Sequence, residues 1–181
     1  MEERFDIAVQ SSPLTPANLI RRDIAPIRWA VCAAPRYLQR FPASREPDDL
    51  RRHNCIFYAS AAVRGDAWTL SRKGQTIRVT VNGNFRANNS EAVRDAAARG
   101  LGLALLPTFA IWQDLTSGAL VRVLPDWVAH GTFGSSLTAY FIADRQLTPK
   151  IRTLVDFLAE RFGKSPAWDR GIAVGAAPKT R

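Results

Sequence analysis

The residues that could carry catalysis or bind a metal are few and widely spaced. His53 and His130 are the only histidines, and neither has a carboxylate or cysteine at metal-site spacing, which favours a surface or loop role for each. Gly134-Ser135-Ser136 is no GxSxG nucleophile motif and predicts a turn. Gly100-Leu101-Gly102 lacks the third glycine of a dinucleotide fingerprint and follows a helix instead of preceding one. We therefore expect no enzyme, no cofactor and no metal.

The remaining reactive side chains also have structural explanations. Asp48-Asp49 could form a carboxylate pair, but acidic residues are favoured at a helix N-terminus by the helix dipole. Cys32 and Cys55 lie in apolar, strand-like surroundings without CxxC spacing. Two buried free thiols in a reducing cytosol are therefore expected. The five tryptophans are dispersed along the chain, which favours packing over a stacking platform.

The unit that could position a ligand is residues 85–107. Asn88 is expected to be the N-cap of a helix, with Glu91 completing a capping box. Gly100 stands where a helix C-terminus needs a left-handed residue. The helix is expected to bury one face, formed by Val93, Ala96, Ala97 and Leu101, and to expose Arg94, Asp95 and Arg99. Residues 101–106 are almost wholly apolar and end at Pro107, which predicts a strand covered on both faces.

The Asn88-Asn89-Ser90 turn is the candidate site in this unit. Unpaired N–H groups and partial positive charge gather at a helix N-terminus, so the turn could hold a polar or anionic small molecule. An ordinary helix cap without a ligand explains the same residues. From the turn alone, the ordinary cap is the favoured interpretation.

Composition limits the class of protein. The 181 residues are 46% apolar, which fits one globular domain or two small lobes. The formal net charge of +9 suggests nucleic acid, but arginines are scattered and form no sustained basic run. Direct nucleic-acid binding would give a gel shift that weakens steeply with salt. No signal peptide or membrane-length apolar run is present, so we expect a cytoplasmic protein without a membrane partner.

The rest of the chain alternates predicted strands and helices. Strands are expected at residues 5–9, 19–24, 26–33, 55–58, 68–70, 77–81, 120–124 and 137–143. Helical segments are expected at residues 35–38, 47–50, 109–115 and, from the Thr148-Pro149 start to Gly163, in an amphipathic helix. Residues 166–181 lose periodicity and read as a flexible tail. This order predicts an α/β protein with a mostly parallel sheet.

Three segments together resemble one known family. FDIAVQSSPL at residues 5–14, NNSEAVRDAAARGLGLALLP at 88–107 and LTPKIRTLVDFLAERF at 147–162 stand in its order and spacing. Shorter matches lie between them, including His53-Asn54-Cys55, and the likeness runs from about residue 4 to about residue 170. The chain is similar to the C-terminal effector-binding domain of LysR-type transcriptional regulators. No single motif is diagnostic, but the combination is specific.

The resemblance implies a two-lobed α/β fold like that of type 2 periplasmic binding proteins, with the first lobe incomplete. Residues 1–30 would be a remnant of lobe I, 31–141 lobe II, 142–165 the return to lobe I, and 166–181 a tail. A small effector would bind between the lobes and modulate transcription, which reverses the weighting of the helix cap toward a ligand role. The implied ligand-binding residues are Gln10, Ser11, Ser12, Asn88, Asn89, Ser90, Leu106 and Pro107. Many relatives carry Arg where this chain has Gln10.

The chain departs from the family at its start. The family's winged helix-turn-helix and the opening of its first lobe are absent, so we expect a fragment, a misassigned start or a degraded gene. DNA would then be a partner only through the missing N-terminal domain, and the full-length form is expected to be a homo-oligomer. An alternative is a solute-binding protein of a transport system. The isolated chain is expected to be poorly soluble because sheet edge and apolar helix face are exposed.

Overall fold

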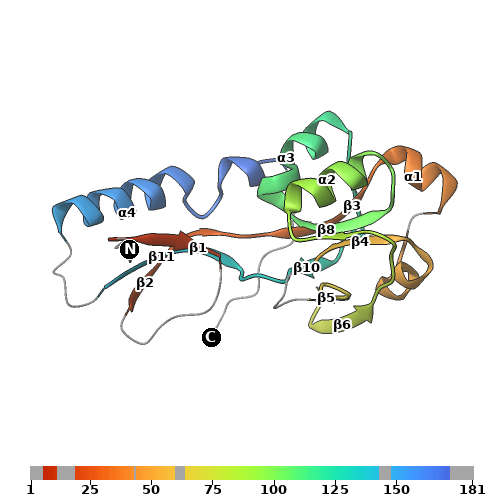
Figure 1. Ribbon diagram of the computed structural model, residues 1–181, viewed down its shortest axis with the longest axis horizontal. Helices are drawn as coiled ribbons and strands as arrows, with labels where there is room; N and C mark the ends of the chain where they lie inside the picture. Colours follow the sequence, from red (N-terminus) through yellow and green to blue (C-terminus); the bar gives the residue numbers. More distant parts are fainter. Residues whose placement is uncertain (1–5, 12–18, 43, 60–63, 143–147, 172–181) are drawn as a thin grey trace. The chain divides into compact units, whose positions relative to one another are not determined.

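A computed structural model describes residues 6–11, 19–42, 44–59, 64–142 and 148–171. Its strands and helices form a mixed α/β protein, as predicted (Figure 1). Contacts divide the chain into two compact units. Unit 1 comprises residues 1–27 and 133–170, and unit 2 comprises residues 28–132 and 171–181. Each unit has its own sheet and its own hydrophobic core.

Unit 1 is a three-stranded antiparallel sheet with one long helix. The strands β1 (Ala8–Gln10), β11 (Ser136–Ile142) and β2 (Leu19–Pro26) lie in the order β1-β11-β2. Helix α4 (Pro149–Phe162) lies along one face of this sheet (Figure 1). Its residues Ile151 and Val155 pack with Ile24, Ala139 and Phe141 of the sheet. The amphipathic pattern of α4 therefore buries the face that the sequence predicted.

The first strand differs from its sequence prediction. We expected a buried-looking strand at residues 5–9, followed by a turn that included Gln10. Phe5 lies outside the described residues, and β1 instead runs Ala8–Gln10 with all three residues exposed. Gln10 belongs to the strand and pairs with Thr138 of β11. The apolar pattern was misleading because the described part of unit 1 covers little of this strand.

Unit 2 is built on an eight-stranded sheet. Seven of its strands follow the order β6-β5-β10-β3-β8-β4-β7, and β9 pairs with β3. The strands are β3 (Trp29–Ala33), β4 (Cys55–Tyr58), β5 (Ala67–Arg72), β6 (Gln75–Thr80), β7 (Arg86–Ala87), β8 (Leu103–Pro107), β9 (Val121–Val123) and β10 (Val128–His130). Strands β3 and β8, which are wholly buried, form its centre.

The prediction of a mostly parallel sheet is wrong. Among the described residues only β4 forms parallel pairs, with β7 and β8, whereas the other pairings are antiparallel. The prediction assumed a helical crossover between successive strands. Instead β5 and β6 form a hairpin, and β8, β9 and β10 each run antiparallel to β3.

Helices α2 (Ser90–Ala98) and α3 (Thr108–Ser117) cover the central strands of unit 2 (Figure 1). Val93 and Ala97 of α2 and Ile111 of α3 are fully buried against the sheet residues Ile56 and Leu106. The predicted apolar face of α2 is therefore correct at its centre. Leu101, also expected in that face, is 38% exposed because it lies beyond the helix end.

The shorter elements largely match their predictions. Helix α1 (Pro35–Arg40) starts at its proline, and the 3-10 helix η1 (Pro47–Arg52) has the acidic first turn expected of Asp48-Asp49. The expected strand at residues 26–33 is instead divided between β2 and β3. All of β11 lies in unit 1, where it pairs with β1 and β2, and the implied lobe boundaries at residues 30, 141 and 165 stay a prediction.

Of the expected tail at residues 166–181, residues 172–181 lie outside the described residues. A 3-10 turn, η2 (Ala167–Asp169), lies within the expected tail, and Trp168 packs on Phe162 with ring centroids 5.3 Å apart. No helix in the described part of the chain is long and apolar enough to cross a membrane.

Candidate functional site

The N-terminus of α2 is capped by Asn89, not by Asn88. The Asn89 side-chain oxygen accepts hydrogen bonds from the backbone N–H of Glu91 at 2.7 Å and of Ala92 at 3.3 Å. Asn89 has the extended backbone typical of an N-cap, with φ −129° and ψ 121°. The predicted capping box from Asn88 to Glu91 is therefore wrong by one residue, because both asparagines suit the position and only the chain path separates them.

Several polar groups of the turn make no hydrogen bond within the residues that the structure describes. Within the described residues, nothing accepts from the backbone N–H of Asn89 or Ser90, and no hydrogen bond is made by the Asn88 side chain or the Ser90 hydroxyl. Asn88 and Asn89 are exposed. The turn thus presents two free backbone donors, an amide and a hydroxyl at the positive end of the helix dipole, which suits an anionic or polar group.

The other end of α2 fixes the helix in place. Gly100 adopts φ +73°, the left-handed conformation that the sequence predicted. Arg36 of α1 donates from Nη2 to the Ala98 carbonyl at 3.0 Å. A cation at this end satisfies an orphan carbonyl and complements the helix dipole. Both ends of α2 are therefore held, so the orientation of the Asn88-Asn89-Ser90 turn is set by the fold.

Leu106 and Pro107 are both buried in β8. The Leu106 side chain is fully buried in the core of unit 2, and Pro107 is the N-cap residue of α3. The next residue, Thr108, donates from its backbone N and Oγ1 to the Arg28 carbonyl, at 2.8 and 3.2 Å. These residues tie β8 and α3 to the start of β3, and their side chains face the interior of unit 2.

The other predicted ligand residues belong to unit 1. Gln10 is exposed on β1 and Ser11 is half-buried, while Ser12 lies outside the described residues. Thr138, the strand partner of Gln10, belongs to a polar cluster in which Asp23 Oδ1 accepts from Ser136 at 3.0 Å and from Thr138 at 2.9 Å. Sequence reasoning missed this cluster because β2 and β11 are more than 100 residues apart.

Both histidines are more enclosed than expected. His53 is 8% exposed, and its Nδ1 lies 3.2 Å from the hydroxyl of Tyr37. His130 shares a hydrogen bond of 2.8 Å with Ser71 through Nε2. Burial lowers the pKa of both imidazoles from the ordinary value of 6.5. His53 lies in the loop before β4, as expected, but its side chain is buried there and contacts Tyr37 of α1, whereas His130 lies on strand β10 and not in a loop.

The thiols match their prediction. Cys32 and Cys55 are free and fully buried, and burial raises the pKa of each thiol to about 12. Neither is poised as a nucleophile. In the described part of the chain no three His, Cys, Asp or Glu residues lie together in a way that could hold a metal ion.

A surface hollow in unit 2 escaped the sequence analysis. It lies between the β5–β6 turn and β10, and its charged lining residues are Arg72, Lys73 and Asp126. The Lys73-Gly74 turn was predicted, but β10 was not, so Asp126 could not be placed beside it.

Comparison with known proteins gives the class of protein to which this fold belongs. The family model for the LysR substrate binding domain matches residues 1–163. The chain is 30% identical over 161 residues to the "Probable HTH-type transcriptional regulator LtrA" of Klebsiella pneumoniae, covering 88% of this chain and 52% of that protein. The chain therefore belongs to the LysR substrate binding domain family and spans about half the length of the curated relatives it matches.

Solved structures agree with this assignment. The regulatory domain of AphB from Vibrio vulnificus superposes with a TM-score of 0.70 at 28% identity, covering 86% of this chain and 75% of that one. Full-length AphB, a virulence activator of Vibrio cholerae, matches with a TM-score of 0.73 at 25% identity, covering 86% of this chain and 52% of that chain. The fold is therefore that of a LysR-type regulatory domain.

Proposed function

We propose that this chain is the ligand-sensing part of a LysR-type transcriptional regulator and binds a small-molecule effector through the N-terminal turn of α2. The observation that supports the proposal is that, within the described residues, the backbone N–H groups of Asn89 and Ser90 and the side chain of Asn88 make no hydrogen bond. A carboxylate or other polar effector group would complete these hydrogen bonds. Gln10, Ser11 and Ser12, with Leu106 and Pro107, remain further proposed ligand-binding positions.

In a full-length regulator, effector binding would shift the population between regulatory states of the DNA-binding partner domain. DNA contact would come from that domain, and the regulator would act as a cytoplasmic homo-oligomer without catalysis. The surface arginines of this chain support the assignment of DNA contact to that other domain. Several of them are paired with carboxylates: Arg21 with Asp23, Arg22 with Asp156, Arg51 with Asp48, Arg64 with Asp66, Arg72 with Glu46, and Arg94 with Asp95.

A solute-binding protein of a transport system is the alternative with a similar fold. The matched relatives are named as transcriptional regulators, which does not favour it. Recovery of the chain from a periplasmic fraction of the source cells would support this alternative.

The effector role is tested by amide NMR of the ¹⁵N-labelled chain titrated with succinate, benzoate and salicylate. We expect at least one of these acids to move the Asn89 and Ser90 amide signals in a saturable way. Ser90→Ala should weaken that binding, whereas Ser117→Ala, on the exposed end of α3, should not. Saturable binding that leaves both amides unmoved would contradict the site, as would equal affinity in Ser90→Ala.

A further inference from the structure

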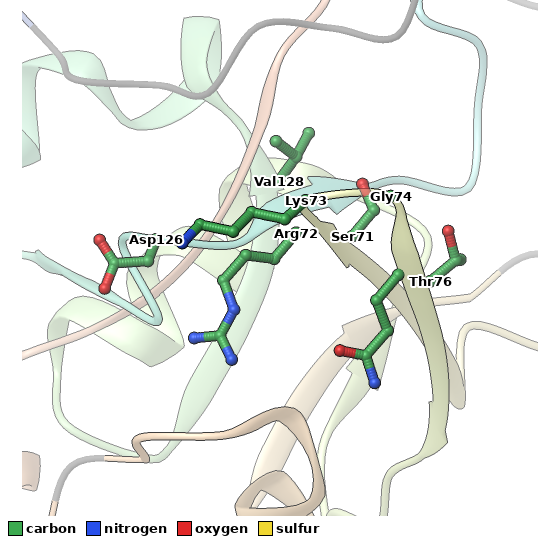
Figure 2. A pocket seen from close by; sticks show the side chains of 8 residues that line it. Ser71, Arg72, Lys73, Gly74, Thr76, Asp126 and Val128 are labelled. Atoms are coloured by element: carbon green, nitrogen blue, oxygen red, sulfur yellow. The ribbon is translucent and has the colours of Figure 1, made fainter.

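The hollow beside the β5–β6 turn has the size of a small-molecule site. Its volume is about 950 Å³, within the range of ligand pockets. Figure 2 shows the side chains that line it from β5, the turn, β6 and the start of β10. They are Ser71, Arg72, Lys73, Gly74, Gln75, Thr76, Asp126 and Val128. None of them belongs to the Asn88-Asn89-Ser90 turn, so the hollow is distinct from the proposed effector site.

Arg72 is fixed in position and still has donors to offer. Its Nη2 donates to both carboxylate oxygens of Glu46, at 3.0 and 3.1 Å. Its guanidinium carbon lies 4.2 Å from the centroid of the Trp127 ring, in a cation–π contact. Nε and Nη1 make no hydrogen bond within the described residues. A guanidinium held in this way loses little conformational freedom when it binds a carboxylate.

Lys73 and Asp126 supply opposite charges at the same hollow. Figure 2 shows the ammonium end of Lys73 extending toward Asp126. The two groups form no ion pair in the part of the chain that the structure describes. The Asp126 backbone is held by the turn before β10, where Trp127 N–H donates to the Leu124 carbonyl at 3.0 Å. The gap between the two charges can therefore receive a bridging molecule.

We propose that this hollow binds a small zwitterion of the α-amino acid class. The carboxylate of the ligand would accept hydrogen bonds from Arg72 and Lys73, and its ammonium would pair with Asp126. Val128 and the methylene stem of Lys73 offer apolar surface for the ligand's side chain. Asp126 is the reason for choosing a zwitterion over a simple anion, because its carboxylate repels a second negative charge and attracts the ammonium.

Three probes of similar size test separately the contributions of the ligand's carboxylate and of its ammonium group. L-Leucine carries both charged groups, 4-methylpentanoate lacks the amine, and 3-methylbutylamine lacks the carboxylate. Amide NMR of the ¹⁵N-labelled 181-residue chain should show saturable movement of residues 71–76 and 126–128 with leucine. We expect weaker movement with 4-methylpentanoate and little with the amine. Because Asn89 and Ser90 report separately, failure here is distinguishable from failure of the effector proposal.

Substitutions of Lys73 and Asp126 test which side chain contacts each charged group of the ligand. Lys73→Asn removes the ammonium while suiting the positive φ of 48° at this position, and should weaken leucine binding by about tenfold. Asp126→Asn should leave the carboxylate analogue bound and abolish the preference for leucine over it. Lys150→Gln, an exposed lysine at the start of α4 in unit 1, is the matched control and should change nothing.

Each alternative result has a defined meaning. No movement of residues 71–76 up to about 20 mM leucine would overturn the proposal. Equal responses to leucine and 4-methylpentanoate would overturn the role of Asp126. Unchanged leucine affinity in Lys73→Asn, with the fold confirmed by circular dichroism, would also overturn the site.

Discussion

The two units of this chain use similar sequence patterns but cover their apolar surface to different extents. In unit 2, β3 and β8 are buried at every residue, and α2 and α3 pack on the central sheet. In unit 1, the strand residues Val9 and Ile20 are 43 and 40% exposed among the described residues, whereas the exposed large apolar side chains of unit 2 lie outside its sheet, at Phe41, Leu101, Phe109 and Trp112. The comparison teaches that an apolar pattern specifies a face, whereas burial depends on how many elements are available to cover it. The expected poor solubility of the chain stays a prediction, and these exposed side chains are its structural basis.

The largest effect should come from a cavity in the core of unit 2. Leu106→Ala removes a fully buried side chain and should lower the free energy of unfolding by about 2–5 kcal/mol. Urea unfolding followed by circular dichroism measures the loss. The control is Leu101→Ala in the same unit. The Leu101 side chain is 38% exposed, so its removal should lower the free energy of unfolding far less. A small loss in Leu106→Ala would break the contrast between the units.

A smaller effect is expected in unit 1. Val155 is fully buried on α4, and Val155→Ala removes two methyl groups, worth about 1–2 kcal/mol. Hydrogen exchange of β2 and β11 should accelerate, while exchange of β3 and β8 should not. Leu154→Ala, next along the helix and 42% exposed, serves as the control. Equal acceleration in both sheets would show that the units unfold together.

The corrected helix cap gives the next prediction. Asn89→Ala deletes the oxygen that accepts from Glu91 and Ala92, and should destabilise unit 2 by about 1 kcal/mol. Asn88→Ala should be nearly neutral in thermal unfolding because its side chain makes no bond in the described structure. The opposite order of the two losses would restore Asn88 as the cap.

The smallest effect is a pH dependence in unit 1. Burial alone would raise the pKa of Asp23, but hydrogen bonds from Thr138, Arg21 and Ser136 outweigh it and hold the pKa below the ordinary 3.8. The folded state therefore binds this proton less readily than the unfolded state. The stabilisation is present above about pH 4 and is lost as pH falls through the lowered pKa.

Asp23→Asn should remove that dependence. Because the Asp23 side chain is 56% exposed, we expect a loss of less than about 1 kcal/mol near neutral pH. Hydrogen exchange of β2 and β11 at several pH values measures it. Asp48→Asn, an exposed partner in a surface ion pair, is the control. A pH profile of Asp23→Asn identical to that of the parent chain would contradict the assignment.

Local patterns predicted the elements better than their pairing. The Lys73-Gly74 hairpin turn, the strand β4 and the α4 start at Pro149 follow from short-range rules, and the structure confirms them. The parallel sheet was wrong because strand direction depends on where the chain returns. The buried pair of Tyr37 and His53 was missed because the two residues are 16 positions apart, on either side of η1.

The sequence by itself determined the class of this protein, because the order and spacing of its matching segments can be read along the chain. It also determined the buried thiols and the polar turn before α2, because apolar surroundings and capping residues are local patterns. Only the tertiary structure decided that Asn89 is the cap and that Arg72, Lys73 and Asp126 share one hollow. The cap depends on the path by which the chain enters the helix. The hollow depends on the pairing of β10 with β5, more than 50 residues away, which no local pattern encodes.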